Sequence, residues 1–186
     1  MMLCRSIPQL RDRLRSFARH KRGVAAVEAA LIFPFMVIAL LGGTELSEAI
    51  AVRRKVALVT RAVTDLTTQY ITMSNSDVST VLNASAAIIA PYAAANMTVT
   101  MSEVTVDNGG NATVTWSRSL NGTPLAQGQK ITLPGNINQP NTSLILGQVS
   151  YSYVPRFSNT VLGTKVFADQ IFMNPRLVNS ITLTGS

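Results

Sequence analysis

Residues 19–43 read RHKRGVAAVEAALIFPFMVIALLGG, so a basic cluster meets a glycine and a long apolar run follows. The run from Val24 to Gly43 would be about 30 Å long as a helix, which matches the hydrocarbon core of a bilayer. Pro34 would bend this helix near its middle, and membrane helices tolerate such a bend when neighbours satisfy the freed carbonyl. We therefore expect a transmembrane helix over 24–43.

Glu28 is the only carboxylate within this run. A charged side chain at mid-membrane costs roughly 2.5–3.5 kcal/mol on insertion scales, and less near the interface. One interpretation is a carboxylate that reaches the lipid headgroups. The other is a prepilin-type processing site, since cleavage after Gly23 would make Val24 the first residue and Glu28 the fifth. The new α-amine would then lie near an acid able to neutralise it.

An ordinary secretory signal is the competing explanation for the apolar run. Its apolar stretch would be shorter, and a small-residue cleavage site would follow it. Here the candidate cut comes before the apolar run, so the anchor would stay on the mature chain. We therefore expect a basic prepilin leader over 1–23.

The basic excess of the chain lies in this leader. The whole chain carries +7, but residues 1–23 hold seven Lys/Arg and one acid, so nine basic and eight acidic residues remain elsewhere. A nucleic-acid-binding domain would carry a basic face on its folded part, so no nucleic-acid partner is expected. The leader charges favour a cytoplasmic N-terminus, with the rest of the chain exported. Four cations beyond the membrane weaken this asymmetry without reversing it: Arg53, Arg54, Lys55 and Arg61.

Side chains of common catalytic and metal sites are scarce. Cys4 is the only cysteine and His20 the only histidine, and both lie in the leader. This excludes an intrachain disulfide, a thiolate or histidine metal site, and the usual Ser-His and Cys-His pairs. The acids after Gly23 form no recognisable motif. We expect no enzyme activity, no cofactor, no metal and no small-molecule substrate.

Beyond the apolar run, the helix is predicted to continue over 44–73 as an amphipathic segment. Apolar residues alternate there at spacings of 3 and 4, which is typical of a heptad seam. The seam could pack on the protein's own sheet or on helices of other subunits. Both can hold if each applies to a different stretch of the helix. The seam consists of Ala49, Val52, Val56, Val59, Val63, Leu66, Tyr70 and Met73.

The remaining residues, 74–186, are predicted to form an exported α+β domain. Ser74 to Asp77 reads as a break and an N-cap, so a second, shorter helix is expected over about 77–90. Pro91 would end it. This helix and the long one must cover a sheet, because a sheet of a few strands is stable only when one face is covered.

Apolar and polar residues alternate farther along the chain, which predicts about four antiparallel strands. The alternation changes phase between Met101 and Val104, which predicts a bulge near Ser102–Glu103. A long surface excursion is expected over 119–143, with one short extended piece at Ile131–Leu133. The other expected features are a hairpin through Asn108–Gly110, a strand over 144–154 and a strand over about 164–173.

The N-terminal junction resembles that of TadE-like proteins, the minor pilins or pseudopilins of the tight-adherence (Tad/Flp) pilus. That family has a basic leader, a Gly before the cut, an Ala-Val-Glu element, a Pro within the apolar helix and a Glu after it. Ala29 stands where the family commonly has Phe. The strong resemblance covers about 19–70, and Val149–Pro155 resembles the family's C-terminal strand. The matching residues are Gly23, Ala26, Val27, Glu28, Pro34 and Glu45.

The resemblance implies a pilin-like fold, cleavage after Gly23 by a prepilin peptidase, and partnership with other pilins and Tad assembly proteins. The mature subunits would sit in the bacterial inner membrane with the C-terminal domain outside the cytoplasm, or in the extracellular pilus. There Glu28 could pair with a neighbour's freed amine, and the pilus would serve surface adhesion. The alternative is an uncleaved single-pass membrane protein that presents an exported binding or scaffold domain.

Overall fold

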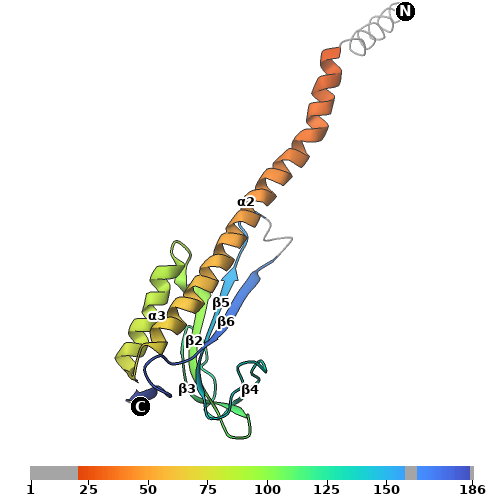
Figure 1. Cartoon of the computed structure of the whole chain (residues 1–186). Helices are drawn as coiled ribbons and strands as arrows, with labels where there is room; N and C mark the ends of the chain where they lie inside the picture. The colour runs from red at the N-terminus through yellow and green to blue at the C-terminus, as the bar shows by residue number, and fades with distance from the viewer. Residues whose placement is uncertain (1–20, 158–162, 185–186) are drawn as a thin grey trace, which may run out of the picture. The chain divides into compact units, whose positions relative to one another are not determined.

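The computed structural model describes residues 21–157 and 163–184 (Figure 1). The predicted leader, with Cys4 and His20, therefore lies almost wholly outside the described residues. The chain divides into two compact units, residues 1–46 and residues 47–186. The second unit begins at Ser47, because part of the long helix belongs to its core.

The long helix, α2, spans Lys21–Thr68 and contains Pro34. It already includes residues upstream of Val24. Its end at Thr68 comes five residues before residue 73, the end predicted from the sequence. The chain turns after Thr68 and enters a short strand, β1 (Thr72–Ser74), in which Met73 is fully buried. Tyr70 and Met73 thus fit the heptad spacing but lie outside the helix. Burial of Met73 in a strand satisfies the same apolar requirement.

The second helix, α3 (Asn75–Ile89), has a two-sided cap at its start. The amide of Asp77 donates to the Ser74 hydroxyl at 3.2 Å, and the amide of Ser74 donates to the Asp77 carboxylate at 2.9 Å. Hydrogen bonds from the Ser74 side chain and backbone lower the pKa of the Asp77 carboxyl below its ordinary value of 3.8. The N-cap predicted within 74–77 is Ser74, and the helix begins two residues before the predicted residue 77. A single-turn 3₁₀ helix, η1 (Ala94–Asn96), follows α3.

The main sheet has five strands in the order β4-β3-β2-β5-β6, with antiparallel pairing throughout. The α+β class with a long N-terminal helix is confirmed. A separate parallel pair joins β1 to β7 (Thr182–Thr184), which the sequence analysis did not predict. The main strands are β2 (Met97–Val106), β3 (Ala112–Leu120), β4 (Lys130–Ile131), β5 (Ser143–Tyr153) and β6 (Lys165–Met173).

Apolar residues cover both faces of this sheet. One face packs against α3 and the Ser47–Thr68 part of α2, and its core includes Met97, Val99 and Met101 of β2 (Figure 1). The opposite face carries Val104 and Val106. Its cover comes largely from the 119–143 excursion, which is therefore more than a surface loop. It supplies Leu125, Ile131 and Leu133.

The predicted bulge is present, but the extra residue lies in β3. Glu103 pairs with Trp116 and Val104 with Val114, so Thr115 is the extra residue that the register of β2 leaves unpaired. The pairing of β2 with β5 continues without a shift across the same residues. The phase change in β2 therefore marks a switch of the buried face, and the bulge turns Trp116 to the helix side.

Candidate functional site

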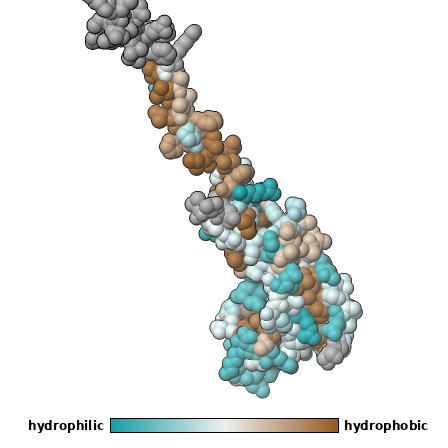
Figure 2. Space-filling model, turned by 180° about the vertical axis from the view of Figure 1, so that it is seen from behind, coloured by the Kyte–Doolittle hydropathy of each residue, from teal (hydrophilic) through white to brown (hydrophobic). Residues whose placement is uncertain are grey.

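The apolar segment of α2 is exposed over most of its length. Nine of its large apolar side chains from Val24 to Leu40 are 55–72% exposed, and Val37 is partly buried. Figure 2 shows this segment as a hydrophobic band along the helix. Water-soluble proteins rarely expose such a continuous apolar surface. Among the described residues, one helix is long and apolar enough to cross a membrane, and it is this one. The segment thus fits a single-pass membrane protein.

The candidate processing residues all lie in the first turns of α2. Gly23, Val24 and Glu28 are exposed. Val24 and Glu28 are four residues apart and share one face of the helix. Cleavage after Gly23 would make Glu28 the fifth residue of the chain, near the positive end of the dipole of a helix that begins at Val24.

Pro34 lies inside α2, and the helix continues on both sides of it. The sequence predicted this arrangement, with Pro34 as the position of a bend.

Farther along, a Cβ at Gly42 or Gly43 would meet nothing within 4 Å. Glu45, the acid that follows the apolar run, is buried with 8% exposed. Glu28 and Glu45 thus occupy different environments.

The heptad seam packs on the protein's own sheet over its middle stretch. Val52, Val56, Val59 and Val63 are at most 1% exposed and belong to the core shared with α3, β2, β3 and β5. Leu66, the next seam residue, remains 37% exposed. For the four valines the partner is therefore the sheet of the same chain.

Threonines accompany the valines on the buried side of α2. The hydroxyls of Thr60 and Thr67 donate to carbonyls one turn earlier, at 2.9 and 2.8 Å, so burial leaves neither unsatisfied. Thr64 does the same at 2.6 Å and lies against Gly147 of β5. Any Cβ at position 147 would overlap the Thr64 hydroxyl. Glycine is therefore needed for this close approach of helix and sheet.

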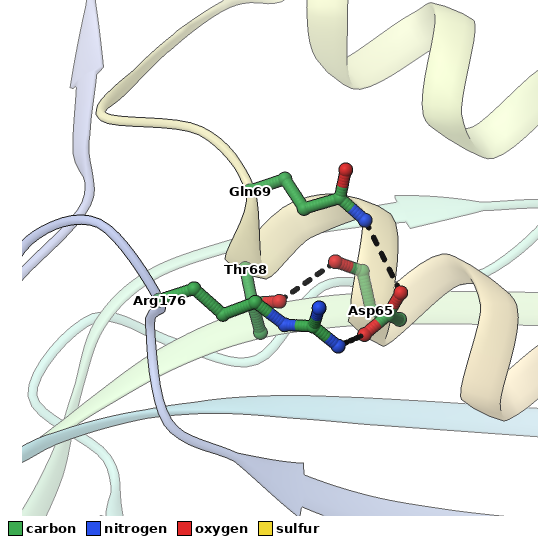
Figure 3. Close-up of polar contacts among 4 residues, drawn as sticks. All are labelled: Asp65, Thr68, Gln69 and Arg176. Atoms are coloured by element: carbon green, nitrogen blue, oxygen red, sulfur yellow. Dashed lines mark hydrogen bonds and ion pairs between the residues drawn. The ribbon is translucent and has the colours of Figure 1, made fainter.

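The C-terminal segment is bonded to the end of α2, which the sequence did not predict (Figure 3). The Arg176 guanidinium pairs with the Asp65 carboxylate. The Arg176 amide also donates to the Thr68 carbonyl at 3.0 Å. Gln69 donates to the other oxygen of Asp65 at 3.1 Å. Asp65 thus joins the last turn of α2 to a segment more than a hundred residues later.

A buried carboxylate holds the same C-terminal segment farther along. Glu103 in β2 is fully buried, and its Oε1 accepts from the Ser143 hydroxyl at 2.6 Å and the Ile181 amide at 2.8 Å. The Trp116 indole donates to the Ile181 carbonyl at 2.7 Å. The amide and the carbonyl of Ile181 therefore both form hydrogen bonds with side chains of the sheet. Among the described residues, no group of three or more His, Cys, Asp or Glu could hold a metal ion.

These features define a class: an α+β unit whose first helix extends into an exposed apolar anchor. Residues 23–65 match the family model of TadE-like proteins, so the resemblance is confirmed over this segment. The match begins at Gly23, the residue before the candidate cut, and ends at Asp65, which forms the ion pair with Arg176. Comparisons with curated proteins and with solved structures gave no significant match.

Proposed function

We propose that this chain is a minor pilin or pseudopilin of a Tad (Flp) pilus, a structural, non-enzymatic component used in pilus assembly and surface adhesion. One observation carries the proposal. The segment matched to TadE-like proteins includes an exposed apolar run, residues 24–43, whose single acid, Glu28, lies four residues after Val24. A membrane anchor needs no such acid, whereas a helix that begins at Val24 gains a neutralising partner for its amine.

Processing is the first step of this function. A prepilin peptidase cuts after Gly23 and leaves the apolar helix on the mature chain, which stays in the inner membrane until assembly. The helical residues on both sides of the cut open for cleavage. Other pilins and the Tad assembly proteins are then the partners of the mature helix. Burial of the exposed apolar side chains against sister helices replaces their contact with lipid.

The test is to identify the N-terminus of the chain by mass spectrometry after co-expression with a prepilin peptidase. Val24 is the expected first residue. The matched control is Gly23→Ala, which should keep the leader and migrate more slowly. Identical migration with and without the peptidase contradicts the processing step, although it leaves the anchor in place.

Orientation is tested separately by fusing alkaline phosphatase near residue 100, within β2. The basic leader predicts a cytoplasmic N-terminus, so the fused enzyme should be active outside the cytoplasm. A fusion near residue 20 should be inactive. The opposite pattern would reverse the orientation and remove the chain from the pilus pathway.

A second candidate is an uncleaved single-pass protein that presents the folded unit as an exported scaffold. It is favoured by the start of α2 at Lys21, so that the helix runs through the candidate cut. In this case the purified chain would begin at Met1 or Met2, also in the presence of the peptidase.

A further inference from the structure

The main sheet has two open edges. At one end of the strand order β6 pairs only with β5 among the described strands. At the other end β4 pairs with only two residues of β3, Ala112 and Thr113, and residues 128 and 129 bond to Val114. From Thr115 to Leu120 no described strand covers the outer edge of β3. Open edges are templates for pairing with another chain.

The strand directions make these two edges complementary. Successive antiparallel pairings from β3 through β2 and β5 leave β6 antiparallel to β3. Two copies of the chain in the same orientation can therefore bring β6 of one copy beside β3 of the next with antiparallel pairing. Antiparallel pairing of β6 with β6 would instead relate two copies by a two-fold axis, and a row of copies could not grow from it.

The side chains select one register for this contact. Asp169 on β6 and Arg118 on β3 form no ion pair among the described residues. Both lie on the helix-covered face, since Asp169 pairs with Val149 and Arg118 with Met101. With Asp169 opposite Arg118, the next pair on this face is Phe167 with Leu120, both apolar and partly buried. A shift by two residues would set each charge against an apolar side chain.

We propose that the chain associates edge to edge with a second copy of itself, β6 of one copy adding antiparallel to β3 of the next, with Asp169 paired to Arg118. The contact is heterologous, so each copy keeps one open edge and a row of copies can grow. Charged residues on an edge strand also serve to keep sheets apart. The proposal goes beyond pilus membership and holds for the processed and the unprocessed chain.

Cysteine cross-linking of the full chain in membranes tests this register. Cys4→Ser removes the only cysteine. One copy then carries Phe167→Cys and a differently tagged copy carries Leu120→Cys. Opposed residues of antiparallel strands have Cα atoms about 4.5–5.5 Å apart, within disulfide range. Oxidation should give a mixed dimer, and neither variant alone should give a homodimer. Ser79→Cys, exposed on α3, is the control partner for Phe167→Cys.

A charge exchange tests the pair itself. Asp169→Arg or Arg118→Asp alone sets like charges opposite each other and should lower the mixed cross-link roughly fivefold. Asp169→Arg and Arg118→Asp in every copy should restore it. Since Phe167 and Leu120 also pack on their own core, Ala168→Cys with Ser119→Cys tests the neighbouring pair without that risk. Absence of both mixed dimers, homodimers as strong as mixed ones, or no restoration by the exchange would overturn the proposal.

Discussion

Gly147 of β5 lies against Thr64 of α2 so closely that a Cβ on the glycine would overlap the threonine hydroxyl. Gly147→Ala should therefore push the helix from the sheet and destabilise the folded unit by ~1–3 kcal/mol. Trp116, the only tryptophan and a buried one, reports unfolding by its fluorescence in a denaturant titration of the micelle-bound chain. The expected result is a lower midpoint with an unchanged slope.

Gly135→Ala is the matched control for this change, because a Cβ there meets nothing within 4 Å and φ is not positive. It should leave the midpoint unchanged. Thr64→Ala should relieve part of the overlap, so the double variant should be more stable than the sum of the single effects predicts. Strict additivity of the two changes would contradict the proposed contact.

Glu103 organises the C-terminal segment through the amide of Ile181, and its removal has a defined cost. Glu103→Ala leaves that buried amide and the Ser143 hydroxyl without an acceptor, so a loss of about 2–4 kcal/mol is expected. Hydrogen exchange of the Ile181 amide, measured by NMR, should speed up more than that of amides in β2. Glu103→Gln keeps an acceptor oxygen and should cost less than the alanine variant. Equal losses for both variants would show that Ile181 is held by other contacts.

The cap of α3 gives a prediction about pH. The Ser74 side chain is the first cause of the lowered pKa of Asp77, so Ser74→Ala should raise that pKa toward 3.8. A carboxylate with a lowered pKa stabilises the folded state at pH values above its ordinary pKa, and the contribution is lost as pH falls through the lowered value. NMR titration of the Asp77 carboxyl measures the change. Ser79→Ala, a nearby substitution outside the cap, should leave the titration unaltered.

The helical part of the fold could be predicted from sequence because its signals are local. The apolar run, the spacing of Val52, Val56, Val59 and Val63, and the cap at Ser74 each depend on residues within one or two turns. The same spacing continued through Tyr70 and Met73, although the helix ends at Thr68. Periodicity cannot place that end, because Met73 meets its burial requirement equally well in a strand.

The parts missed by sequence depend on residues distant in the chain. The pair between Asp65 and Arg176 and the bond from Ile181 to Glu103 join positions 111 and 78 residues apart. Strands β1 and β7 have three residues each, too short for a pattern. The phase change near Val104 carried a correct signal, a register shift at that point. The sequence of β2 could not show which strand holds the extra residue. Its alternation is the same whether the bulge lies in β2 or in its partner β3.

Glu28 provides the final prediction, on assembly. If the acid neutralises the amine of Val24 in a neighbouring subunit, Glu28→Gln should leave membrane insertion and leader cleavage intact. It should lower the number of pili on the cell surface at least tenfold. Insertion is measured by carbonate extraction, cleavage by the shift in migration, and piliation by electron microscopy of cells that lack the native chain.

Glu28→Asp is the matched variant, since it keeps the charge on a shorter side chain and should restore part of the piliation. The headgroup interpretation predicts a different result. An acid that only reaches the lipid surface is costly to the anchor, so its neutralisation should favour insertion and leave assembly unchanged. Normal piliation with Glu28→Gln would therefore assign the residue to the membrane interface, and the charge that guides the helix in assembly would have to lie elsewhere in the chain.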